Sequence, residues 1–108
     1  SGGGAAKAAQ DEVESSLPEL IEQVAKAAFA EAVSLGNRLL GAQSLTSTQV
    51  VTIHKELAVA YVALERTDLA EASFRAALAL QPNLELDTVR TSPRVLEAFT
   101  RAKQPDEP

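Results

Sequence analysis

The 108-residue chain has no cysteine and only one histidine. Without cysteine it can form no disulfide framework, no thiolate nucleophile and no cysteine-ligated metal site. A lone histidine is a poor basis for a metal site, so His54 is interpreted as a partly buried structural residue. We therefore expect no metal and no cofactor. The lack of cysteine suits reducing and oxidising compartments equally and leaves the localisation open.

Long apolar runs and clusters of basic residues are also missing. No stretch approaches the roughly 18 apolar residues that span a bilayer, and the N-terminus has no charged region followed by an apolar one. The formal net charge is -5 and the ten Lys and Arg are scattered. Nucleic acids and anionic membranes both require clustered cations. We expect no nucleic-acid partner and no membrane insertion.

Motifs that carry catalysis are absent as well. The chain contains neither a G-x-S-x-G nucleophile motif nor a Gly-rich phosphate loop. The acidic residues Asp11, Glu12 and Glu14, and Asp87 further along, lack the apolar neighbours that would separate the pKa values of an acid–base pair. The sequence predicts a protein that is not an enzyme.

What the sequence contains favours helices. Apolar residues make up 45% and charged residues 23%, with only three Phe and one Tyr. An apolar content dominated by Ala, Leu and Val suits closely packed helices better than a β-sandwich. We expect one all-α domain over residues 16–103. Residues 1–15 would be a flexible lead that includes a tag remnant, and residues 104–108 a flexible tail.

Capping signals mark where helices start. A Ser, Thr or Asp followed three residues later by Glu or Gln is a capping box. Such pairs are Ser16 with Glu19, Thr46 with Gln49, and Asp68 with Glu71. The second pair predicts a helix from about Ser47 to Glu65, and the third a helix that ends near Leu80. Ser92 followed by Pro93 predicts a short last helix to about Lys103.

The first helix is the ambiguous one. An apolar stripe runs from Leu17 to Leu39, and the segment AKAAFAEA at 25–32 has high helix propensity throughout. We expect one long helix to Leu40, with a break near Ala28 as the alternative.

Small and large residues alternate in a characteristic way over residues 51–84. The residues are Leu57-Ala58, Tyr61, Ala70, Phe74, Ala77 and Pro82. This pattern resembles the tetratricopeptide repeat (TPR) family, whose repeat is a helical hairpin of about 34 residues. His54 stands where the family usually has Trp, and Glu65 where the turn often has Gly. The resemblance implies antiparallel, TPR-like hairpins, here with a long N-terminal helix and a short C-terminal capping helix.

The segment after the repeat carries a second resemblance. Leu86-Asp87, Ser92-Pro93-Arg94-Val95 and Phe99 resemble an extension that follows repeats in bacterial, often envelope-associated, proteins. This implies a bacterial source and a cell-envelope setting, with the cytoplasm as the other possibility.

The TPR resemblance also implies a binding face. In that family the first helix of each repeat lines a concave groove, which would place Thr52, Lys55, Val59, Val62 and Ala63 there. Lys55 matches one cation of the family's carboxylate clamp, but Val59 replaces the required Asn. The face suits an apolar or helical segment of a protein or peptide partner. We expect an adaptor or scaffold module for protein–protein interaction, part of a larger protein or assembly.

Two alternatives stay open. Val59 and Val62 could pack against the first helix instead of a partner. The stripe from Leu17 to Leu39 could pair with a second copy, which would make the chain a homodimer or a structural scaffold element.

Overall fold

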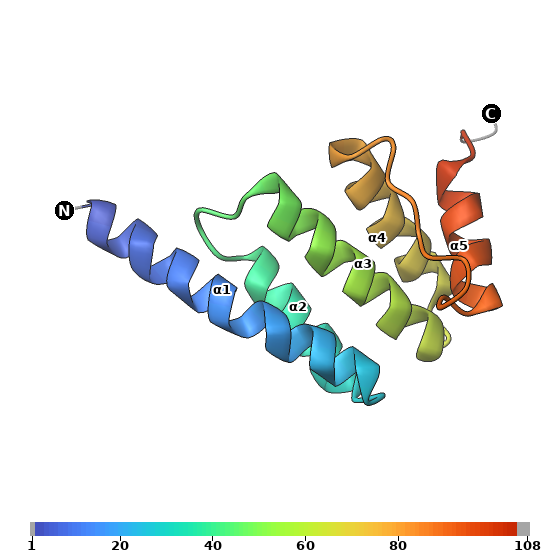
Figure 1. Ribbon diagram of the computed structural model, residues 1–108, viewed down its shortest axis with the longest axis horizontal. Helices are drawn as coiled ribbons and strands as arrows, with labels where there is room; N and C mark the ends of the chain where they lie inside the picture. The colour runs from blue at the N-terminus through green and yellow to red at the C-terminus, as the bar shows by residue number, and fades with distance from the viewer. Residues whose placement is uncertain (1, 106–108) are drawn as a thin grey trace.

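The structure is a computed structural model that describes residues 2–105, with side chains described from Gly4 onward. In this range the chain is all-helical and has no strand (Figure 1), as the composition predicts. The five helices are α1 (Gly2–Ala25), α2 (Phe29–Leu40), α3 (Ser47–Ala63), α4 (Thr67–Leu80) and α5 (Pro93–Lys103). None of these helices is both long enough and apolar enough to cross a membrane.

The path of the chain changes after the fourth helix. From α1 to α4 each helix runs opposite to the one before it (Figure 1). Residues 81–92, which we call the crossover, then carry the chain back to the turn between α3 and α4. There Arg94 at the start of α5 bonds Glu65 in that turn. As a result α5 runs beside α4 in the same direction.

α3 is the central helix, because it lies against each of the other four. One side of α3 packs with α1 and α2 through Ile53, Leu57 and Ala60. The other side packs with α4, the crossover and α5 through Val51, Ala58 and Val62. Tyr61 contacts both of these core clusters, so two cores share one helix.

The single long helix expected up to Leu40 is wrong. α1 ends at Ala25 and α2 begins at Phe29. Between them Ala27 has a φ of 64°, and the N–H of Ala28 donates to the carbonyl of Gln23 at 2.8 Å. This is the geometry of a Schellman motif. A left-handed Ala costs about 1–2 kcal/mol, and burial of the facing sides of α1 and α2 outweighs both this cost and the local helix propensity.

A turn of the same type connects α3 and α4 in the second hairpin. Glu65 has a φ of 62°, and the N–H of Arg66 donates to the carbonyl of Tyr61 at 2.8 Å. Both hairpins therefore end their first helix with a left-handed residue that is not glycine, at positions 27 and 65.

Residues 2–15, expected as a flexible lead, are helical where the structure describes them. Val13 is fully buried in the core cluster of α1 and α2. The side-chain amide of Gln10 donates to the carbonyl of Ser44 and accepts from Gln49. The lead is thus tied to the start of α3. No residue of the tail beyond Pro105 lies within the described range.

The capping signals are correct at two helix starts and wrong at two. Thr46 and Gln49 form the full capping box of α3, and Ser92 caps α5 by accepting from the N–H of Val95. By contrast Ser16 lies inside α1 and is mostly buried. α4 begins after Arg66 without a side-chain cap, and Asp68 instead pairs with the Arg66 guanidinium.

Candidate functional site

The five predicted partner-binding residues all lie on α3, but they do not form one exposed face. Val62 is 3% exposed and belongs to the core shared with α4 and α5. Val59 is half-buried against that same core rather than against α1. Thr52 and Lys55 are partly exposed and Ala63 is exposed. The accessible part of the face is therefore Thr52, Lys55, Val59 and Ala63, while Val62 packs in the interior.

A cavity of about 210 Å³, which we call the α3 hollow, opens beside Lys55 and Val59. α3 contributes Lys55, Glu56 and Val59 to its lining. The other lining residues are Phe74 of α4, Leu86, Asp87 and Thr91 of the crossover, and Val95 of α5. Val59, Phe74, Leu86 and Val95 form its apolar walls. The carboxylates of Glu56 and Asp87 and the ammonium of Lys55 are its charged lining groups. Residues from four segments thus meet at one place on the predicted face.

A compact turn around Asp87 shapes the crossover side of the hollow. One carboxylate oxygen of Asp87 accepts from the backbone N–H groups of Val89 at 2.9 Å and Arg90 at 3.2 Å. The carbonyl of Asp87 accepts from the N–H of Thr91 at 3.0 Å. These bonds hold the backbone between Asp87 and Thr91. Leu84, which is 6% exposed, fixes the preceding part of the crossover in the core.

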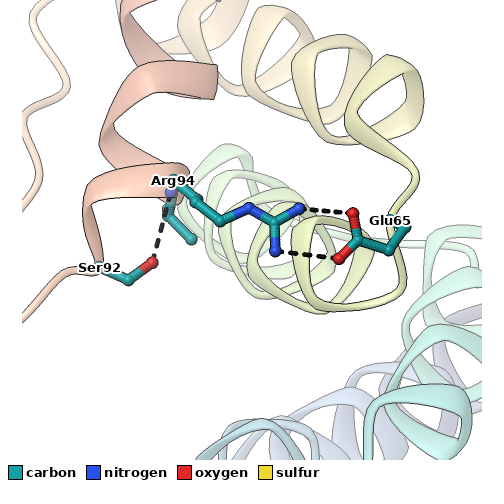
Figure 2. A network of polar contacts seen from close by, with 4 residues as sticks. Glu65, Ser92 and Arg94 are labelled. Carbon is teal, nitrogen blue, oxygen red and sulfur yellow. Dashed lines mark hydrogen bonds and ion pairs between the residues drawn. The ribbon is translucent and has the colours of Figure 1, made fainter.

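The α5 side of the hollow is held by the polar contacts in Figure 2. The guanidinium of Arg94 donates two hydrogen bonds to the carboxylate of Glu65, at 3.0 and 2.7 Å. The hydroxyl of Ser92 accepts a hydrogen bond from the backbone N–H of Val95. The hydrogen bonds from Arg94 lower the pKa of Glu65 below its ordinary value. Because Arg94 precedes Val95, this pair positions the α5 wall of the hollow.

Two titratable groups on α3 are affected by burial. Burial raises the pKa of Glu56, and the neighbouring charge of Lys55 partly offsets this shift. Burial lowers the pKa of His54, whose Nδ1 is buried without a hydrogen-bond partner in the described part of the chain. The partial burial of His54 and its lowered pKa agree with its interpretation as a structural residue.

A second cavity of about 410 Å³, which we call the α5 hollow, lies between the crossover and α5. Its lining residues are Glu85, Leu86, Thr88, Leu96, Phe99, Thr100 and Lys103. The ammonium of Lys103 lies 4.7 Å from the ring centroid of Phe99. Leu86 lines both hollows, so this one side chain separates them.

Sequence reasoning identifies Lys55 and Val59 but misses the crossover. It places Asp87 in a loop and includes Leu86 only as part of an extension motif. The alternation of Leu84, Glu85 and Leu86 is a signal that one face of this segment is buried. Nothing in the sequence pattern shows that the segment returns to α3. Within residues 2–105 no group of three His, Asp or Glu side chains is arranged to hold a metal ion.

The apolar stripe considered for a homodimer is used largely inside the chain. Leu20, Leu35 and Leu39 are buried in the core cluster of α1 and α2. Leu17 and Val24 pack against that cluster, and Ile21 is 45% exposed.

No protein-family model, curated protein or solved structure matches this chain. The helices and the two hollows are therefore the basis for assigning a function.

Proposed function

We propose that this chain is a TPR-like protein-interaction module that binds a peptide or helix of a partner through the α3 face. The observation that carries the proposal is the α3 hollow, because it opens beside Lys55 and Val59 on the face expected to bind. A hollow with apolar walls and charged groups at its edge is suited to anchor one side chain of a bound segment. A setting in a larger bacterial, envelope-associated assembly is part of this proposal and rests on the resemblance of the segment after Pro82.

The stacking of the helices supports the TPR-like part of the proposal. α3, the first helix of the second hairpin, lies against α1, the first helix of the first hairpin, whereas α2 and α4 do not approach each other. First helices that stack on one another are what a repeat array requires to form a continuous face. Close approach of helices needs small residues. Gly36, Ala58, Ala70 and Ala77 supply them in buried positions.

The exposed side chains of α1 and α5, at the two ends of the stack, include several polar groups. The exposed side chains of α1 include Glu12, Ser15, Glu19 and Glu22. The exposed residues of α5 include Arg94, Glu97 and Arg101, of which Arg94 pairs with Glu65 and Arg101 with Glu71. A repeat stack needs such polar surfaces at its ends to remain soluble. The reversed direction of α5 suits an end cap, because a continuing repeat would start its helix beside the end of α4.

The homodimer alternative has less support. A stable interface buries about 1,200 Å² or more in total. The stripe from Leu17 to Leu39 offers Ile21 as its largely exposed apolar side chain, since the others pack inside the chain.

A peptide-display selection tests the proposal and needs no identified partner. We expect peptides selected on the immobilised protein to shift the backbone amide resonances of Thr52, Lys55 and Val59. Val59→Asp should abolish their binding, and Ala72→Asp, on an exposed part of α4, should leave it intact. If Val59→Asp impairs folding, Thr52→Arg blocks the same face from a partly exposed position. Selected peptides that map to α1 around Ile21, or a selection that enriches no peptide, would reject the proposal.

A further inference from the structure

We infer that the α3 hollow accepts a lysine or arginine side chain of the partner, with its aliphatic stem against the apolar walls and its cationic head beside Glu56. This inference rests on the proposed function, because it names the chemistry of the anchor that the α3 face would bind.

The size and walls of the hollow fit one long side chain. Its volume of about 210 Å³ is bounded by Val59, Phe74, Leu86 and Val95. Lysine and arginine bury their methylene stems along apolar surface while the charged head stays near polar groups. The hollow provides this combination, since its apolar walls adjoin the carboxylates of Glu56 and Asp87. A whole helix would not enter a space of this size, so the occupant is a side chain.

Glu56 is the group that requires a counter-charge. Among the described residues its carboxylate makes no ion pair and no hydrogen bond. Lys55 is adjacent in sequence, and neighbouring residues on a helix point in different directions. Burial raises the pKa of Glu56, and its carboxylate oxygens are not among the fully buried polar atoms, so an entering cation can reach them. An entering guanidinium or ammonium would supply a charge-assisted hydrogen bond to it.

Asp87 contributes less than Glu56 to this recognition. One of its oxygens already accepts two backbone N–H groups, and the Nε of Arg90 lies 3.8 Å from the other. Because Asp87 is paired with Arg90, Glu56 and Lys55 are the charged lining groups that can pair with an occupant. The short side chain of Glu56 keeps its carboxylate at the hollow, whereas the long stem of Lys55 lets its ammonium extend into solvent, so the hollow favours a cation over an anion.

Small probes test the inference directly. We would titrate the protein with n-butylguanidinium and n-butylammonium and follow the methyl resonances of Val59, Leu86 and Val95. n-Butanol and butyrate are the uncharged and anionic controls. We expect saturable shifts with both cations, and no saturable shift at these methyls with butanol or butyrate.

Two substitutions should change the affinity for n-butylguanidinium in opposite directions. Glu56→Gln should weaken it about tenfold, because a hydrogen bond to a charged group is lost. Lys55→Gln should strengthen it severalfold by removing repulsion. Glu97→Gln is the matched control, since it removes one negative charge from an exposed position that lines neither hollow, and it should leave the affinity unchanged.

Several outcomes would overturn the inference. Equal affinity for Glu56→Gln and Glu97→Gln, or saturation by butanol, would show that the charge of Glu56 plays no part. Saturation by butyrate at Val59 would assign the anchor to Lys55 and an acidic partner. Display-selected peptides that bind the α3 face without a lysine or arginine would reject the inference and leave the proposed function standing. Cation binding without any peptide on this face would instead reject the proposed function, and the partner assignment with it.

Discussion

The first hairpin packs closely against α3 at Gly36, and this contact makes a sharp prediction for Gly36→Ala. Gly36 is a buried residue of α2. A Cβ added there would lie 2.6 Å from Cδ2 and 2.9 Å from Cγ of Leu57 on α3. Leu57 is 1% exposed, so its side chain could turn away only within the packed core. The two helices would have to separate, or Leu57 would have to leave its preferred rotamer.

The magnitude follows from two opposing terms. Alanine is favoured over glycine inside a helix by about 1 kcal/mol, whereas an extra carbon in a packed core typically costs about 1–3 kcal/mol. Carbon pairs are optimal at about 3.5–4.0 Å, so an approach of 2.6 Å belongs at the upper end of that cost. We expect Gly36→Ala to lower the free energy of unfolding by about 1–2 kcal/mol. Each kcal/mol lost should lower Tm by roughly 4–8 °C.

Urea denaturation followed by far-ultraviolet circular dichroism measures this change. Gly4→Ala is the matched control, because a Cβ at Gly4 meets no atom within 4 Å, and it should be neutral or slightly stabilising. Leu57→Ala should cost less in the Gly36→Ala background than in the native chain, with a coupling of about 0.5–3 kcal/mol. A Gly36→Ala variant as stable as Gly4→Ala would refute the close approach of α2 and α3.

Three further tests concern the first turn, the core and the ion pair at α5. Ala27→Gly should stabilise the protein by about 1 kcal/mol, since it relieves a left-handed alanine. Ala72→Gly, at an exposed position inside α4, should destabilise it by about 0.5–1 kcal/mol; equal effects in urea denaturation would contradict the turn geometry. Phe74→Ala should cost about 3–5 kcal/mol, because Phe74 is fully buried, and a loss under about 1 kcal/mol would place it outside the core. The Arg94 pair lowers the pKa of Glu65, so its contribution is present above the ordinary Glu pKa and is lost as the pH falls through the lowered one. The stability difference between the native chain and Glu65→Gln should therefore shrink on acidification, and a difference independent of pH would rule this out.

Local signals predict helix type and several helix ends well. Thr46 and Ser92 cap the helices that they are expected to cap, and α4 ends at Leu80 before Pro82. These features depend on neighbouring residues, so the sequence alone can show them. The break at Ala27 corresponds to the alternative of a break near Ala28, but local signals favour the single helix, because no Gly or Pro marks the break and the segment has high helix propensity. Only the burial of α2 against α1 decides in favour of a turn.

The residues of the candidate site are likewise predicted only where a local sequence pattern places them. Lys55 and Val59 are found because a repeat pattern places them on one side of α3, and Val62 is assigned to the same side although it packs inward. The sequence could not show that the crossover returns to α3, because a reversal of chain direction leaves no local pattern. Leu86, Asp87 and Thr91 are therefore missing from the predicted face.

The reversed attachment of α5 also bears on the order in which the protein assembles. Each hairpin joins helices that are adjacent in sequence, whereas α5 is held by the long-range pairs Glu65–Arg94 and Glu71–Arg101. Contacts between distant residues pay a larger loop-closure entropy and form later. We expect the hairpins to fold first, and the amide hydrogens of α5 to exchange with solvent faster than those of α3, which is covered on two sides. The α3 hollow would then exist only while α5 is docked, and an occupant of the hollow would slow hydrogen exchange in α5 without touching most of it.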